Sequence, residues 1–157
     1  MSQAARLWPT IPDVPFSSVI NRLRLTDYSK QPPAESGPEF PIFVARTNAD
    51  GNPIGGIEPP EVTVPLGTYS GRNFRAEGFG EGDLCDLSGS YIPFAVTKKE
   101  RLANHDSRLS LEERYQNQED FAAKRKQAAD RLVQQRLLLP DDAPMFSVVP
   151  LPSTAAK

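Results

Sequence analysis

Hydrophobic and polar positions follow two different patterns along the chain, and the change falls near residue 96. Before that point, short apolar runs are separated by Pro and Gly, which predicts irregular structure with short strands. Residues 97–142 contain no Gly and a single Pro, and their apolar positions recur at helical spacing. We therefore predict an α+β fold, in which a small hairpin-based sheet and Pro/Gly-rich loops are followed by C-terminal helices.

The 157 residues have the length of one domain. We divide them into a Pro/Gly-rich extended and β-hairpin segment (1–96), a helical segment (97–142) that forms one structural unit with the first, and a tail (143–157). The end of the tail, from Pro150, is expected to fray.

The clearest strand candidate covers residues 40–46, which are rich in β-branched and aromatic side chains and are bounded by turn signals. Asp50 and Gly51 follow. This dipeptide predicts a hairpin turn because the tight turn needs a positive φ. Residues 52–57 would form the return arm, weakened by Pro53.

Other segments before residue 97 give weaker patterns. Residues 61–66 alternate with period two, so we predict an edge strand that ends near Pro65, followed by a turn at 67–71. Residues 19–25 alternate weakly and are predicted as a short strand. Residues 8–16 hold three evenly spaced prolines and are expected to lie extended along a surface. Their apolar anchors would be Trp8, Ile11, Val14 and Phe16.

Capping residues predict where two short helices begin. Thr97 can cap a helix that runs to about Ala103. Ser110 and Glu113 have the spacing of a capping box, in which each side chain bonds a free amide of the first turn. A second short helix is therefore expected to run to about Tyr115.

The longest helix is predicted over residues 118–138. Asn117 can cap its first turn, and Pro140 can stop it. Its apolar positions fall on one stripe, which predicts a buried face. The stripe consists of Phe121, Ala122, Ala128, Ala129, Leu132, Val133 and Leu137.

Composition excludes several classes of function. The net charge is −2, so the chain lacks the positive field of a nucleic-acid-binding protein. No apolar run reaches the roughly 18 residues of a membrane helix. The chain has one Cys and one His. It therefore cannot form an internal disulfide or a metal site that needs two Cys or two His ligands. We expect no cofactor, no metal, no nucleic acid and no membrane partner.

The candidate nucleophiles lack the surroundings that catalysis needs. Ser70 lies near two glycines, but not at the Gly-x-Ser-x-Gly spacing of a nucleophile elbow. His105 stands in a polar stretch that is interpreted as a connection between helices. Cys85 lies near Asp83 and Asp86, which would raise the pKa of its thiol, so we interpret it as a small buried residue.

Two charged clusters could be functional, but we interpret both as ordinary surface features. The run at 124–126 is interpreted as a solvated helix face. The acidic residues of the Gly-rich stretch offer oxygen ligands for calcium, but their spacing does not fit an EF-hand loop. These acids are Glu77, Glu81, Asp83 and Asp86.

Several stretches together resemble the C-terminal part of the alpha/beta hydrolase domain-containing proteins, a bacterial family of considerably longer chains. The similarity runs from about Pro9 to Asp142 and is specific as a set, although no single motif is. The matching stretches are residues 21–28, 48–57, 60–71, 73–75, 89–94, 109–115, 129–132 and 137–142.

The resemblance implies an ester-type hydrolase whose catalytic Ser, acid and His lie upstream, so no catalytic residue is carried over to this chain. His105 stands where the family usually has Gly, and Ser70 where it has Thr. Arg72 stands where it tends to have Trp, which changes the apolar wall of the cleft if this stretch lines it. The cleft-lining residues would be Tyr69, Arg72, Asn73 and Arg75.

We therefore expect a C-terminal portion of an α/β-hydrolase-like protein that completes the fold or the cleft, with the N-terminal hydrolase core as its partner. The alternative is a stand-alone interaction module that wraps a partner through its Pro-rich arm and its long helix. A third and least favoured reading is a small hydrolase that uses Ser70 or Cys85 with His105.

Overall fold

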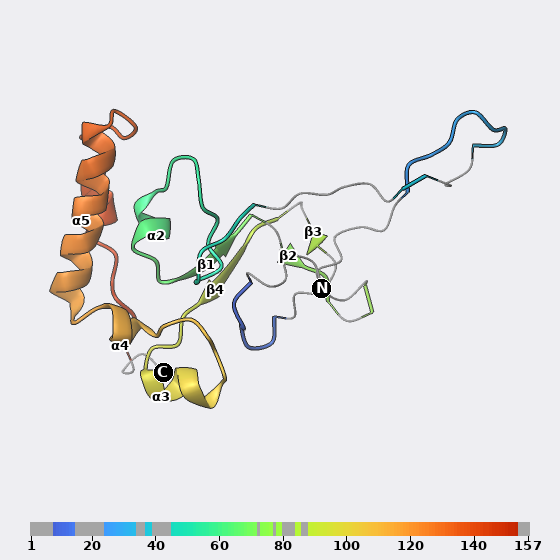
Figure 1. The fold of residues 1–157 in the computed structure, drawn as a ribbon. Helices are drawn as coiled ribbons and strands as arrows, with labels where there is room; N and C mark the ends of the chain where they lie inside the picture. The colour runs from blue at the N-terminus through green and yellow to red at the C-terminus, as the bar shows by residue number, and fades with distance from the viewer. Residues whose placement is uncertain are drawn as a thin grey trace.

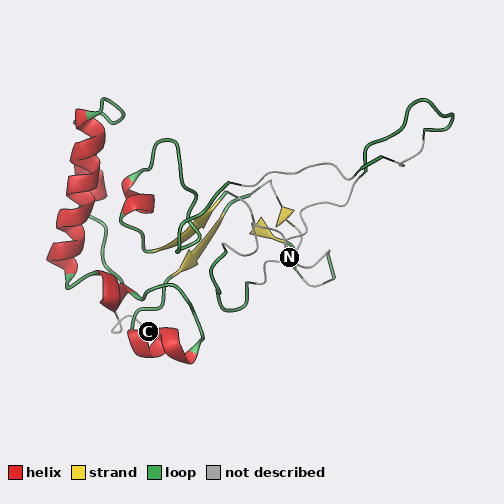
Figure 2. Ribbon diagram, viewed as in Figure 1, coloured by secondary structure: helices red, strands yellow, loops and turns green. Residues whose placement is uncertain are grey.

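The structure is a computed structural model, which describes residues 8–14, 24–33, 37–38, 45–71, 73–76, 78–79, 84–85 and 88–153. These residues form a mixed α+β fold, as predicted (Figures 1 and 2). The helices are α2 (Pro60–Thr63), α3 (Lys98–Ala103), α4 (Leu111–Arg114), α5 (Gln118–Gln134) and the 3₁₀ helix η1 (Ala143–Phe146). The strands are β1 (Gly67–Ser70), β2 (Asn73–Phe74), β3 (Leu84–Cys85) and β4 (Ser90–Pro93).

The described strands form two antiparallel pairs. β1 pairs with β4 in a register that runs from Gly67 opposite Pro93 to Ser70 opposite Ser90. β2 pairs with β3 over two residues of each strand. Figure 2 shows the longer pair between the helices and β2–β3, so it forms the centre of the described fold.

One hydrophobic core joins residues from before and after residue 96. The ring of Phe121 on α5 is fully buried and contacts the ring of Tyr115 at 4.8 Å in a T-shaped arrangement. The hydroxyl of Tyr115 donates a hydrogen bond of 2.8 Å to the carbonyl of Pro65. The segment that leads into β1 is thereby held against the helices. The core consists of Val64, Leu66, Phe94, Leu111, Tyr115, Phe121 and Ala128.

This buried phenol predicts a loss of stability at alkaline pH. Burial raises the pKa of Tyr115 to about 12, whereas the unfolded chain releases that proton near 10. The stabilisation that the protonated Tyr115 phenol gives the folded state is complete below pH 10 and is lost as the pH rises towards 12. In urea unfolding from pH 7 to 12, Tyr115→Phe should be about 1 kcal/mol less stable at pH 7. Its decline above pH 10 should be shallower, and an unchanged decline would contradict this assignment.

The predicted helix starts are confirmed. Thr97 Oγ1 accepts a hydrogen bond from the amide of Glu100 at 3.1 Å. Ser110 and Glu113 form the capping box. Hydrogen bonds from Arg101 and Ser110 lower the pKa of the Glu113 carboxyl to about 2, because they favour its ionised form.

The predicted end of the longest helix is wrong by four residues, because α5 stops at Gln134. Arg136 has a φ of 61°, and its amide bonds the carbonyl of Val133. The amide of Leu137 reaches back to the carbonyl of Leu132 at 2.9 Å. These two bonds form a Schellman motif, which ends a helix without Gly or Pro.

The edge strand predicted at 61–66 is also wrong. Residues Pro60–Thr63 form the single helical turn α2, and the strand begins at Gly67, where we predicted a turn. Pro60 stands in the first turn, where its fixed φ suits a helix and its missing N–H is not needed. The alternation arose because Val64 and Leu66 enter the core after the helix has ended.

The turn predicted at Asp50 and Gly51 is confirmed. Gly51 has a φ of 79°, and the side chain of Asn48 accepts hydrogen bonds from the amides of Asp50 and Asn52. Thr47 bridges Pro53 in antiparallel fashion. The strands predicted at 40–46 and 19–25 lie mostly outside the described residues.

Both ends of the described chain are attached to the helical segment, residues 97–142. Ile11 is buried, and the amide of Thr10 donates to Ser107 Oγ at 2.9 Å, as expected for a segment lying along a surface. Trp8 and Val14 are partly buried, and Phe16 lies outside the described residues. The tail is not frayed at Leu151, whose amide donates to the side chain of Gln118 at 2.6 Å.

Candidate functional site

The two-stranded sheet β1–β4 is closed along its β1 edge by a side chain. The amide of Phe94 bonds the carbonyl of Leu66, so the alternation of an antiparallel pair directs the Gly67 carbonyl and the Tyr69 amide outwards. Asn52 is fully buried. Its side-chain amide donates to the Gly67 carbonyl at 3.3 Å, and its side-chain oxygen accepts from the Tyr69 amide at 2.6 Å. Its side-chain amide therefore takes the place of a neighbouring strand.

Arg108, which is only 3% exposed, is hydrogen-bonded to the end of β4. Its guanidinium donates to the carbonyl of Ile92 at 3.0 Å and to that of Pro93 at 3.2 Å. It also donates to Thr68 Oγ1 at 2.9 Å and pairs with the buried carboxylate of Asp106 at 2.7 Å. The positive charge is thus neutralised and fully hydrogen-bonded, which burial requires.

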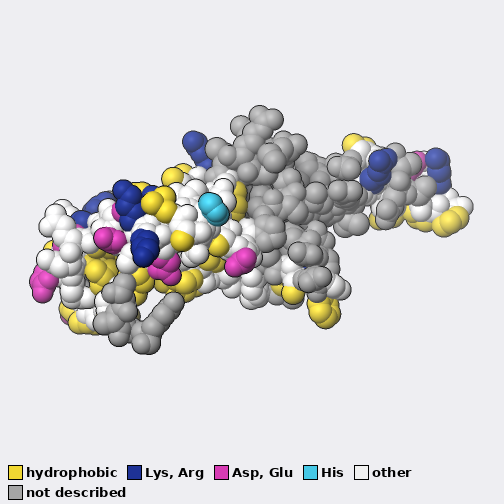
Figure 3. All heavy atoms as spheres, turned by 90° about the horizontal axis from the view of Figure 1, so that it is seen from below, with side chains coloured by type: hydrophobic (Ala, Val, Ile, Leu, Met, Phe, Trp, Pro, Cys, Tyr) yellow, Lys and Arg dark blue, Asp and Glu magenta, His cyan; other side chains and the backbone are white. Residues whose placement is uncertain are grey.

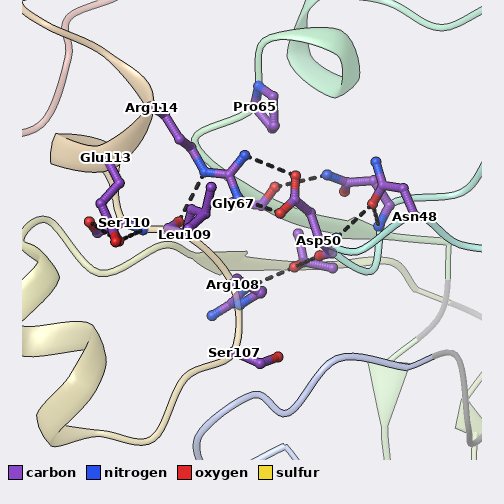
Figure 4. Close-up of polar contacts among 12 residues, drawn as sticks. Asn48, Asp50, Pro65, Gly67, Ser107, Arg108, Leu109, Ser110, Glu113 and Arg114 are labelled. Atoms are coloured by element: carbon purple, nitrogen blue, oxygen red, sulfur yellow. Dashed lines mark hydrogen bonds and ion pairs between the residues drawn. The ribbon is translucent and has the colours of Figure 1, made fainter.

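A second arginine ties the turn around Asp50 to the helices (Figure 4). The guanidinium of Arg114 on α4 pairs with both carboxylate oxygens of Asp50. The hydroxyl of Thr68 donates to the backbone carbonyl of Asp50. The ring of Phe94 lies 4.2 Å from the Arg114 guanidinium and 5.2 Å from that of Arg108. Cation–π contacts therefore add to the ion pairs here.

An aromatic pair stands on the sheet framed by these contacts. Tyr69 and Tyr91 are directly opposite, with ring centroids 4.9 Å apart. The Tyr91 ring also covers Gly67, where an added Cβ would come within 2.5 Å of the Ile92 carbonyl oxygen. The Tyr91 hydroxyl donates to the Leu66 carbonyl at 3.2 Å. Burial raises the pKa of both phenols.

The structure locates three of the four predicted cleft residues. Tyr69 is partly buried in β1, whereas Asn73 in β2 and Arg75 just after it are exposed. Arg72 lies outside the described residues. These positions leave the cleft-lining role a prediction.

The candidate nucleophiles lie on separate elements. Ser70 ends β1 and is buried, and Cys85 lies in β3 and is only partly buried, so its interpretation as a buried residue is not supported. The single histidine, His105, follows α3 and lies on the surface (Figure 3). α3 and β3 are well separated in Figure 1, so His105 does not meet Cys85.

Metal binding gains no support within the residues that the structure describes. There, no three His, Cys, Asp or Glu side chains gather where they could hold a metal ion. The four acids weighed as calcium ligands, Glu77, Glu81, Asp83 and Asp86, all lie outside these residues.

The local role of His105 is to end α3. Its φ is 54°, its amide bonds the carbonyl of Leu102, and the amide of Asp106 reaches the carbonyl of Arg101. This is a second Schellman motif, whose left-handed position favours Gly. The interpretation of the stretch as a polar connection between helices is confirmed.

Replacing His105 with Gly should therefore stabilise the protein. The left-handed strain exceeds the extra entropy that Gly gives the unfolded chain, so we expect a gain of about 0.5 kcal/mol in the free energy of unfolding. Urea unfolding would measure it. His105→Ala keeps the strain and is the control, for which we expect no gain; an equal gain in both variants would contradict the cap assignment.

The basic run at 124–126 was only partly interpreted correctly. Lys124 and Lys126 are exposed and pair with acids one turn away. Arg125 is instead buried, donates to the carbonyl of Phe146 at 2.7 Å and pairs with Glu61 at 3.2 Å. It joins α5 to both η1 and α2.

Comparison with known families identifies the scaffold. A family model of the alpha/beta hydrolase domain matches residues 17–146, which is most of the chain. The chain belongs to this alpha/beta hydrolase domain family. No curated protein and no solved structure matches it. None of the helices in the described part of the chain is long and apolar enough to span a membrane.

In this alpha/beta hydrolase domain protein, the residues that organise the candidate site were mostly missed from the sequence. Asn52 belongs to a stretch that carried the resemblance, which was a signal for it. Arg108 and Asp106 stand in a polar stretch with no such signal, because the sequence of a polar stretch does not show whether an arginine in it is buried or exposed.

Asn52 offers a direct test of the closed β1 edge. Asn52→Asp keeps the shape but places a carboxylate against the Gly67 carbonyl, where no proton is left to donate. We expect a loss of about 2–3 kcal/mol in the free energy of unfolding, measured by denaturant titration. Gln127→Glu makes the same chemical change at an exposed site of α5 and should stay within about 0.5 kcal/mol. Equal effects would show that Asn52 holds no strand edge.

Proposed function

We propose that this chain is the non-catalytic C-terminal portion of an esterase-type alpha/beta hydrolase, which completes the fold of an N-terminal hydrolase core and forms one wall of its substrate cleft. The observation that carries the proposal is the Tyr69–Tyr91 pair on a sheet whose β1 edge is closed by Asn52 and whose β4 strand is held at its end by Arg108.

The aromatic pair suits the wall of a cleft for an ester. Tyr91 is 49% exposed although its ring is fixed by Gly67 and by the Leu66 carbonyl, so it offers apolar area that needs no ordering on binding. Asn73 and Arg75 follow in the chain and are exposed, which supplies polar groups beyond the rings. The family membership supports acyl-ester hydrolysis as the reaction of the whole protein.

The first test is the intact mass of the native protein, detected with an antibody to the helices of residues 97–142. We expect a species heavier than 17.3 kDa that hydrolyses 4-nitrophenyl esters. In that species, Tyr91→Ala should raise KM several-fold and leave kcat nearly unchanged, because it removes ground-state binding. Leu102→Ala, at an exposed site on α3, is the control.

The purified 157-residue chain should hydrolyse the same esters no faster than buffer. Hydrolysis that is lost in Ser70→Ala or His105→Ala would overturn the proposal in favour of a small independent hydrolase. A KM unchanged by Tyr91→Ala would remove the cleft wall from the proposal.

The alternative, a stand-alone interaction module, is favoured by one observation. Several large apolar side chains of the described residues are exposed although the chain has its own core. A native species of 17.3 kDa with a cooperative thermal transition would support this alternative. The exposed set includes Ile54, Ile57, Phe79, Leu102, Leu137, Leu139, Met145 and Val148.

A further inference from the structure

An apolar groove lies where the chain turns back beyond the C-terminal end of α5 (Figure 1). Its volume is about 410 Å³, within the range of small-molecule sites. A smaller hollow of about 180 Å³ shares Leu137 with it and reaches Ile57 on the other side. Leu137 is 48% and Leu139 67% exposed. The groove is lined by Val133, Arg136, Leu137, Leu138, Leu139 and Pro140.

The groove carries one positive charge that no acidic side chain in the described part of the chain neutralises. Arg136 is the only charged side chain among the described residues that line the groove. Among the described residues, the guanidiniums of Arg136 and of Arg131 in the smaller hollow have no hydrogen-bond or ion-pair partner. Glu58 also lines the smaller hollow, so an anion would meet repulsion there but not at Arg136.

The backbone at Arg136 is the second unusual feature. Its φ of 61° is the left-handed conformation that Gly adopts freely and that is strained for an arginine. His105 has the same conformation at the end of α3, and Arg136 differs from it in lining an apolar groove, where its side chain has no charged partner among the described residues.

We propose that this groove binds a medium-chain carboxylate, with its alkyl tail on the leucine-lined floor and its carboxylate paired with the Arg136 guanidinium. The planar guanidinium can bond both oxygens of a carboxylate, which distinguishes it from a neutral alcohol of the same length. The site lies at the end of α5, apart from the tyrosine pair, and does not rest on the proposed function.

The test is a titration of the isotope-labelled 157-residue chain with decanoate below its micellar concentration, followed by amide NMR shifts. Saturable shifts are expected over residues 133–140, and decanol should bind at least threefold more weakly. Arg136→Gly should raise the melting temperature, because it relieves the strain, and still weaken decanoate binding at least threefold. Leu139→Ser should weaken decanoate and decanol alike.

If Arg136→Gly is more stable and yet binds decanoate more weakly, Arg136 acts on the ligand and is not needed for the structure. Equal affinities for decanoate and decanol, an unchanged affinity in Arg136→Gly, or shifts confined to other residues would each overturn the proposal. None of these outcomes bears on the ester-hydrolysis assays described above.

Discussion

Replacing Arg108 with alanine should lower the free energy of unfolding by about 3–5 kcal/mol, the largest loss we expect from any charged residue of this protein. The side chain is 2% exposed and holds Asp106, Thr68 and two carbonyls of β4. Its removal leaves a buried carboxylate without a counter-charge and removes the hydrogen bonds to the end of β4. Denaturant unfolding followed by circular dichroism would measure the loss.

Two comparisons make this result specific. Arg131→Ala removes an arginine that is exposed and has no partner among the described residues, so it should change stability by no more than about 0.5 kcal/mol. Replacing Asp106 together with Arg108 should be less damaging than the sum of the single changes, by at least about 1 kcal/mol. Purely additive losses would show that the two charges do not depend on each other.

Replacing Phe121 with alanine should lower the free energy of unfolding by a further and independent amount, about 3–5 kcal/mol. The ring is 0% exposed, contacts the ring of Tyr115 and lies 5.6 Å from the guanidinium of Arg125. Its removal opens a cavity in the core that joins α5 to the segment before β1. The same unfolding measurement applies.

A graded series tests the packing argument. Phe121→Leu keeps most of the volume and should lose less than half as much stability as Phe121→Ala. Leu102→Ala truncates an exposed side chain and should stay within about 0.5 kcal/mol. A small effect of Phe121→Ala would mean that the helices are not packed on the segment before β1 as described.

Local signals in the sequence were read correctly where the interacting groups are neighbours in the chain. The helix starts at Thr97, Ser110 and Asn117 depend on a side chain and an amide three residues away. The turn at Gly51 depends on its own φ. Such features need no partner from elsewhere, so residue type and spacing suffice.

The errors have a common physical origin. Val64 and Leu66 stand two positions apart, as they would on one face of a strand, but Pro60 had already begun a helical turn. Arg125 stands in a basic run that is ordinary on an exposed helix face, yet Glu61 and Phe146 surround it. In each case the environment comes from a distant segment, which periodicity does not report.

The sequence alone therefore determined the α+β class, the helix starts, the turn and the resemblance to the hydrolase family, because each rests on residue type and short-range spacing. Only the tertiary structure decided that Asn52 closes the β1 edge, that Arg108 holds the end of β4 and that Tyr69 meets Tyr91. These contacts join segments far apart in the chain. They stabilise the protein because the groups involved are buried, and that burial exists only after the chain has folded.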